Sequence, residues 1–162
     1  MPKILRLPEL TAPGCEAALV DDSAGEFINQ ADLLAEVARH SAAASLNVRV
    51  APADRVEDLA PHLGLVARVG IVFPGPGEGR GYTYARLLRQ RYGFTGEIRA
   101  VGAGVKQDLL FFMVRCGFDA FDLVPTENIA EARQALTRFT LAYQPALPRP
   151  DVREARFTAA RH

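Results

Sequence analysis

Hydrophobic residues follow two periodicities along this chain, and the change from one to the other repeats. Short runs rich in β-branched and aromatic residues, bounded by glycine or proline, predict strands. Longer stretches with apolar residues three and four positions apart predict helices. The predicted strands span residues 17–20, 46–50, 66–73, 97–101 and 118–124. The predicted helices span residues 29–40, 55–63, 82–92 and 106–116, and a last one begins near Pro125 and reaches Tyr143.

Glycine, proline and short polar residues mark the ends of these elements. Pro74 ends one strand, and Gly93 and Gly117 follow two of the helices, where the left-handed C′ position favours glycine. Residues 51–54, Ala-Pro-Ala-Asp, predict a turn in which Asp54 caps the next helix. Asn29 is predicted to cap the first helix.

Strands separated by single helices must pair in parallel, so the chain is predicted to be an α/β protein with a parallel sheet of about five strands. We expect an open three-layer sandwich, with helices on both faces. The alternative is half of a (β/α) barrel, completed by another chain, because a whole barrel needs about 250 residues. Residues 1–143 are predicted to form a single α/β domain, and residues 144–162 a proline-rich C-terminal arm.

The composition places the chain among soluble globular proteins, with 49% hydrophobic and 23% charged residues. Nineteen basic and nineteen acidic residues cancel, which argues against nucleic acid as a partner. Apolar runs are far shorter than the ~20 residues that span a bilayer, and the N-terminus lacks the apolar region of a secretory signal. We therefore expect a cytoplasmic protein with no membrane partner.

Two cysteines and three histidines occur at unrelated positions, so no metal site is predicted. Cys116 falls in an apolar helix and is expected to be a buried thiol. Arg86, Arg89 and Arg91 lie on the helix 82–92, and most of them are expected on its solvated face.

Ligand sites of parallel α/β proteins lie at the carboxyl ends of the strands. Residues 78–121 hold six Arg and one Lys against two Glu and two Asp, a local excess of three positive charges. The glycines of Glu78-Gly-Arg-Gly-Tyr82 would let a ligand approach the backbone, and Arg80 would bind a carboxylate or phosphate. The alternative is a tight structural loop in which Arg80 pairs with Glu78 or a helix end.

Gly102-Ala-Gly104 stands between a strand and a helix, as a phosphate-binding turn does. It lacks the third glycine of a dinucleotide fingerprint and the Gly-Lys-Ser/Thr ending of a P-loop, and a purely structural turn is the stronger alternative. Asp108, near the start of its helix, suits the helix dipole. The candidate ligand-binding residues are Glu78, Gly79, Arg80, Gly81, Tyr82, Arg99, Gly102, Gly104, Lys106 and Asp108.

The segment from Glu78 to Gly102 and the Phe111-Phe-Met-Val-Arg-Cys-Gly-Phe-Asp-Ala-Phe121 segment resemble a bacterial domain-of-unknown-function family, number 934. The resemblance covers roughly residues 46–123. Members of this family are often encoded beside sulfite reductase and are sometimes labelled oxidoreductases. The positions that match the family's motifs are Arg80, Tyr82, Arg86, Arg89, Arg99, Asp108, Arg115 and Asp119.

Two departures from the family pattern lie in the glycine-rich loops. Glu78 stands where the family has aspartate, and Ala103-Gly104, with one residue inserted, replaces an acidic residue after Gly102. If that carboxylate belongs to the family's site, this chain is expected to have an altered activity.

The resemblance implies an accessory protein of assimilatory sulfate or sulfite reduction, and the residues suggest that it binds a small anionic ligand. One alternative is an oxidoreductase that uses a flavin or nicotinamide cofactor, and another is an interaction module without chemistry that docks on sulfite reductase. Whether the chain is an enzyme, and whether it needs a cofactor, stay open. We also expect a homodimer, because three features expose surface for self-association. They are the half-barrel-like run of strand-helix units, the apolar face of the C-terminal helix, and the C-terminal arm.

Overall fold

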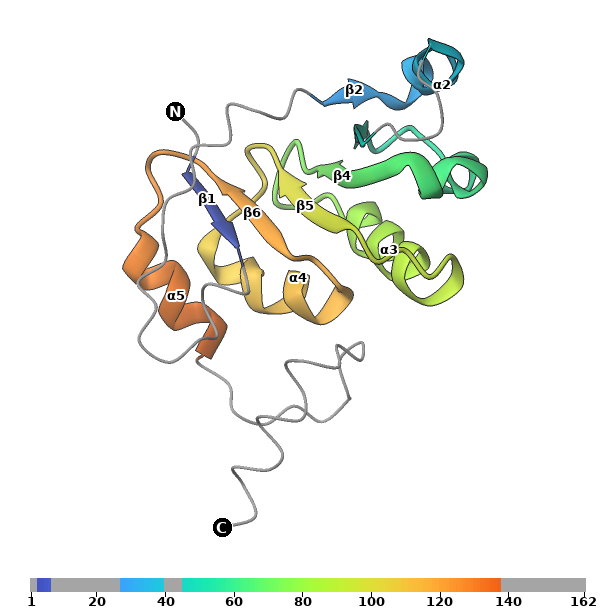
Figure 1. Ribbon diagram of the computed structural model, residues 1–162. Coiled ribbons are helices and arrows are strands. Elements are labelled where there is room, and N and C mark those ends of the chain that lie inside the picture. Colours follow the sequence, from blue (N-terminus) through green and yellow to red (C-terminus); the bar gives the residue numbers. More distant parts are fainter. Residues whose placement is uncertain (1–2, 7–26, 40–44, 138–162) are drawn as a thin grey trace.

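The computed structural model describes residues 3–6, 27–39 and 45–137, and in these ranges six strands form one open sheet (Figure 1). The strand order is β1-β6-β5-β4-β3-β2. Strands β2 to β6 pair in parallel, and β1 pairs with β6 in antiparallel orientation. The prediction of an open α/β sheet with about five parallel strands is therefore confirmed. The strands are β1 Lys3–Arg6, β2 Ile28–Asn29, β3 Leu46–Val50, β4 Val66–Val72, β5 Glu97–Val101 and β6 Ala120–Leu123.

Helical segments connect the parallel strands, and several differ in type from the predicted α-helices. The α-helices are α2 Leu33–Arg39, α3 Arg80–Arg86, α4 Leu110–Cys116 and α5 Ile129–Thr137. The 3-10 segments are η1 Gln30–Asp32, η2 Val56–Leu65 and η4 Gln107–Leu109, and a π turn, η3 Leu87–Arg91, extends α3. Pro61 lies inside η2, and its missing N–H is one reason why this connection is not a regular α-helix.

The predicted ends are mostly confirmed. Gly93 and Gly117 have left-handed φ angles of 63° and 106°. The predicted helix caps are wrong in detail: Asp54 Oδ2 accepts the N–H of Ala51 at 2.7 Å and so closes its own turn, and Asn29 makes no side-chain cap hydrogen bond.

The predicted strand 17–20 and the arm 144–162 lie outside the described residues. Neither β1 nor β2 was predicted, because runs of four and two residues are too short to show a periodicity.

The parallel strands advance across the sheet in one direction, from β2 at one edge to β6 beside β1. Crossovers of this kind are right-handed in about 98% of cases, so successive connections fall on the same face of the sheet. Figure 1 shows α3, α4 and α5 together on one side of the strands. The described helices therefore supply one of the two helical layers of the expected sandwich.

The two faces of the sheet differ in chemistry. The face toward the helices is apolar and fully buried, as its alternating residues Val48, Val50, Val69, Ile71, Ile98, Ala100, Phe121 and Leu123 show. We call the opposite face the charged face. It carries Arg49, Arg68, Glu97, Arg99 and Asp122. The hydrophobic core thus lies between the sheet and its single described layer of helices.

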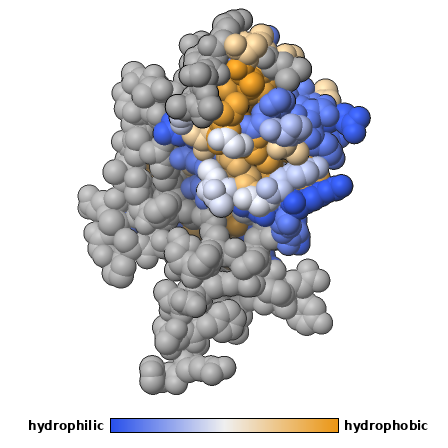
Figure 2. Space-filling view, turned by 45° about the vertical axis from the view of Figure 1, so that its right-hand side comes forward, coloured by the Kyte–Doolittle hydropathy of each residue, from blue (hydrophilic) through white to orange (hydrophobic). Residues whose placement is uncertain are grey.

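Figure 2 brings the side with α2 and α3 forward and shows an apolar area bordered by hydrophilic side chains. Partly buried hydrophobic residues of β2, α2 and η2, including Ile28, Val37 and Leu63, pack against the core. Within the described ranges, no helix has the length and apolar character needed to cross a membrane.

Candidate functional site

The two glycine-rich loops meet at the carboxyl edge of the sheet. One loop follows β4 and leads into α3, and the other follows β5 and leads into η4. The N–H of Gly104 donates to the carbonyl of Phe73 at 2.8 Å, and the N–H of Phe73 donates to Val101 at 2.8 Å. The structure therefore brings Glu78, Gly79, Arg80, Gly81 and Tyr82 to the same edge as Gly102, Gly104, Lys106 and Asp108.

Close packing of backbone against backbone explains the glycines of the 102–104 turn. Gly102 has a φ of 106°, and a Cβ there would lie 2.6 Å from the carbonyl oxygen of Phe73. A Cβ at Gly104 would lie 2.4 Å from the carbonyl oxygen of Gly75. These glycines let the two loops approach each other, so the geometry agrees with the structural alternative for this turn.

Arg80 holds the start of α3 against the loop after β3. Its backbone N–H donates to Oε1 of Glu78 at 2.9 Å, and its exposed guanidinium donates through Nη1 to the carbonyl of Pro52 at 2.9 Å. The hydroxyl of Tyr84 donates to the carbonyl of Asp54 at 2.7 Å, also in that loop. The Pro52 contact uses one of the five N–H groups of the guanidinium.

Glu127 occupies the start of η4, where an anion was predicted. Its Oε2 accepts the backbone N–H of Gln107 at 3.1 Å, and its Oε1 lies 3.4 Å from Nζ of Lys106. A carboxylate is stabilised there because the first amides of a helical segment are unpaired. Nothing in the sequence linked Glu127 to this loop, since 20 residues separate it from Gln107.

Tyr82 lies half-buried in the first turn of α3. Its ring packs edge-on against Phe73, with the ring centroids 5.4 Å apart. Burial raises the pKa of the Tyr82 hydroxyl, and the nearby Cys116 and Asp108 raise it further. The hydroxyl therefore stays protonated at neutral pH and can act there as a hydrogen-bond donor.

Arg99 is separate from these loops. It lies on the charged face with only 3% of its surface exposed, and its Nε and Nη2 donate to Oε1 of Glu97 at 2.9 and 2.6 Å. Glu97 begins β5, so the guanidinium is held toward the amino end of the strand. Its charge centre also lies 5.5 Å from the ring centroid of Phe27.

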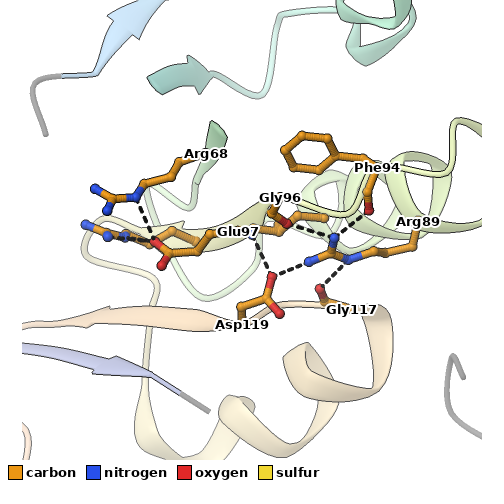
Figure 3. Close-up of polar contacts among 9 residues, drawn as sticks. Arg68, Arg89, Phe94, Gly96, Glu97, Gly117 and Asp119 are labelled. Carbon is orange, nitrogen blue, oxygen red and sulfur yellow. Dashed lines mark hydrogen bonds and ion pairs between the residues drawn. The ribbon is translucent and has the colours of Figure 1, made fainter. Parts of the chain in front are cut away.

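Arg86 and Arg91 are exposed, so the expectation that most of these arginines lie on a solvated face is confirmed, but Arg89 is partly buried. Its Nη1 donates to the carbonyls of Phe94 and Gly96 at 2.5 and 2.8 Å, and its Nε to Gly117 at 3.1 Å (Figure 3). Its Nη2 pairs with Oδ2 of Asp119.

The contacts of Arg89 lie at the amino ends of β5 and β6, opposite the carboxyl edge. Oδ2 of Asp119 also accepts the backbone N–H of Ile98 at 2.7 Å. Burial lowers the pKa of Arg89 to about 10, which leaves it charged at neutral pH. The Arg89–Asp119 pair therefore connects four segments of the fold and has a structural role.

Two further observations concern metal ligands and the thiol of Cys116. Among the residues that the structure describes, no three His, Cys, Asp or Glu side chains group as metal ligands would. Cys116 is a free, half-buried cysteine, and burial raises the pKa of its thiol despite the nearby Arg86 and Arg115. A raised pKa disfavours the reactive thiolate.

Comparison with known families places these features in a bacterial group. Residues 47–152 match the family described as bacterial protein of unknown function (DUF934). The chain belongs to this family. The match includes both glycine-rich loops, the Arg89–Asp119 pair and Glu127, and it extends past residue 123, where the resemblance in the sequence ended. No curated protein matches the chain.

Proposed function

We propose that this family member is an accessory protein of sulfite reduction that acts by binding and carries out no chemical step of its own. The link to sulfite reduction rests on the family resemblance. The observation that supports a binding role concerns the backbone N–H donors at the carboxyl edge, which already bind acceptors within the protein. An α/β enzyme would hold its cofactor at this edge.

The donors in question belong to both glycine-rich loops. The N–H groups of Gly104, Val105 and Gln107 donate to Phe73, Gly102 and Glu127, and that of Arg80 donates to Glu78. A phosphate group of a flavin or dinucleotide would have to displace these acceptors. The edge is therefore organised as a set of structural turns, which favours docking over cofactor chemistry.

The partner in this proposal is the sulfite reductase polypeptide. Phe112, on the outer side of α4, is 53% exposed, and large aromatic residues are enriched at protein interfaces. We expect analytical ultracentrifugation of the chain with sulfite reductase to show a complex that Phe112→Ser weakens at least tenfold, which is about 1.4 kcal/mol.

The matched control for this experiment is Tyr92→Ser, an aromatic truncation directly after the π turn η3. It is expected to leave the complex unchanged. Absence of a complex at micromolar concentrations of both proteins would refute the docking proposal.

Binding of a small anion through Arg80 is a second candidate function. The exposed position of the guanidinium, which the Pro52 carbonyl holds in place, favours it. Phosphate, sulfate or sulfite at a hundredfold excess over Kd would raise the stability by about 2.7 kcal/mol. Thermal melts would detect this change, and an equal shift in Arg80→Ala would refute Arg80 as the ligand.

The oxidoreductase alternative has a simple test. A retained flavin would give the purified protein a yellow colour and visible absorbance. A spectrum of this kind would overturn the proposal of a binding protein without chemistry.

A further inference from the structure

The helices α3 and α4 pack against each other on the same side of the sheet (Figure 1). Residues three and four positions apart lie on one side of a helix. Tyr82, Arg86 and Arg89 follow this spacing along α3 and η3. Nε of Arg89 donates to the carbonyl of Gly117, directly after α4, at 3.1 Å. The side of α3 that carries Arg86 therefore faces α4.

The outer side of α4 carries two aromatic rings and a guanidinium that contact one another. Leu110 and Met113 are buried, so the residues between them in sequence point away from the core. The rings of Phe111 and Phe112 pack edge-on with their centroids 5.7 Å apart, and Phe112 is exposed. The charge centre of Arg115 lies 5.5 Å from the ring centroid of Phe111. An apolar centre with a cation at its border results.

The helices around these rings are strongly basic. Residues 80–91 and 107–116 hold five arginines and one acidic residue, Asp108. Arg89 is neutralised by Asp119 within the fold, so four arginines and one carboxylate remain, an excess of three positive charges. The chain as a whole has no net charge, so this excess is local. A partner that binds here is expected to be acidic, because opposite potentials meet at interfaces.

We call Arg86, Phe111, Phe112 and Arg115 the α3–α4 surface. Its composition is that of a protein interface, in which aromatic residues and arginine are enriched. Arg86 is exposed, and the ring of Phe111 restricts the half-buried Arg115. A side chain that is already held in place loses less conformational freedom when a partner binds. The α3–α4 surface therefore combines an apolar contact area with two groups that recognise carboxylates.

We propose that the α3–α4 surface binds an acidic segment of the partner protein. An apolar side chain of that segment packs on Phe112, and its carboxylates bind Arg86 and Arg115. The guanidinium group supplies paired donors that match a carboxylate. The excess of positive charge attracts an acidic segment and raises the rate of association. The proposal rests on the proposed docking function for the identity of the partner, the sulfite reductase polypeptide.

Analytical ultracentrifugation of the full chain with sulfite reductase tests the proposal. Arg86→Glu is expected to weaken the complex roughly tenfold, and Arg115→Gln, which removes only the charge, to weaken it less. Added salt is expected to weaken the wild-type complex, because exposed charges are screened. The matched control is Arg55→Glu, since Arg55 is exposed and follows Asp54, whose carbonyl binds Tyr84 on another side of α3. It is expected to leave the complex unchanged.

A second experiment separates this surface from the choice of partner. The full chain is titrated with a synthetic peptide in which one leucine is flanked by glutamates, and a lysine-flanked peptide of equal length is the control. Amide NMR signals of α3 and α4 are expected to shift with the glutamate peptide only, and Arg86→Glu to remove the shifts.

The outcomes of the two experiments are distinct. If sulfite reductase forms no complex but the glutamate peptide shifts α3 and α4, the docking function fails and the acidic-segment surface is supported. Three results would each overturn the surface: no shift with the glutamate peptide, the same shifts with the lysine peptide, or a reductase complex that Arg86→Glu weakens no more than Arg55→Glu does.

Discussion

At the scale of the residue, Arg89 is a side chain that joins several segments of the fold. Its guanidinium binds three carbonyl groups and Asp119, and only 15% of its side chain is exposed. Arg89→Ala is expected to lower the free energy of unfolding by about 3–5 kcal/mol, because it removes the cation beside the partly buried carboxylate of Asp119 and the donor to the three carbonyl groups. Chemical denaturation measures this change.

The matched control for Arg89→Ala is Arg91→Ala, two residues further along the same π turn. Arg91 is exposed, and its substitution is expected to change the free energy of unfolding by no more than about 0.5 kcal/mol. Equal effects of the two substitutions would contradict the structural role of the Arg89–Asp119 pair.

Cys116 carries a second prediction at this scale. Its half-buried thiol has a raised pKa, so the thiolate fraction at neutral pH is small. In a Cys15→Ser variant, which leaves Cys116 as the one cysteine, labelling by a thiol reagent is expected to be slow until the protein unfolds. Labelling of the native protein as fast as of the denatured one would instead support a redox role.

At the scale of the element, the packing of α3 on β4 depends on Gly81. A Cβ at this position would lie 2.4 Å from Cζ of Phe73 and 3.0 Å from Cγ2 of Ile71. Gly81→Ala is therefore expected to destabilise the protein by about 1–3 kcal/mol through overpacking. Thermal and chemical denaturation without ligand measure this effect.

Gly79→Ala is the control for Gly81→Ala, because nothing lies within 4 Å of a Cβ at Gly79. It is expected to leave the stability nearly unchanged. If both substitutions preserve stability, the glycines of this loop are not needed for packing. That result would favour the alternative that they let a ligand approach the backbone.

At the scale of the whole molecule, we expect a homodimer. The sheet is open, and its edge strand β2 has two residues. Light scattering at micromolar concentration is expected to give twice the 17.6 kDa mass of one chain. The monomer mass, unchanged on deletion of residues 144–162, would contradict both the dimer and the part of the arm in it.

The sequence by itself determined the order of the main strands and of the helical segments between them. β3 and β5 have the predicted bounds, and Gly93 and Gly117 end their helices as expected, because these features depend on local periodicity and on backbone conformation. The parallel pairing also followed from the sequence, since single helices between successive strands favour it. The placement of the glycine-rich loops at one edge followed from the same topology.

Only the tertiary structure decided how the polar groups pair. Arg89 looked like any other helix arginine, but it binds groups from 5 to 30 residues away. Arg99 was expected beside the glycine loops, yet its strand turns it toward the opposite face and Glu97. Glu127 had no local feature that marked its contact with Gln107. Such contacts join residues distant in the chain, and the geometry of the sheet, which no short pattern encodes, brings them together.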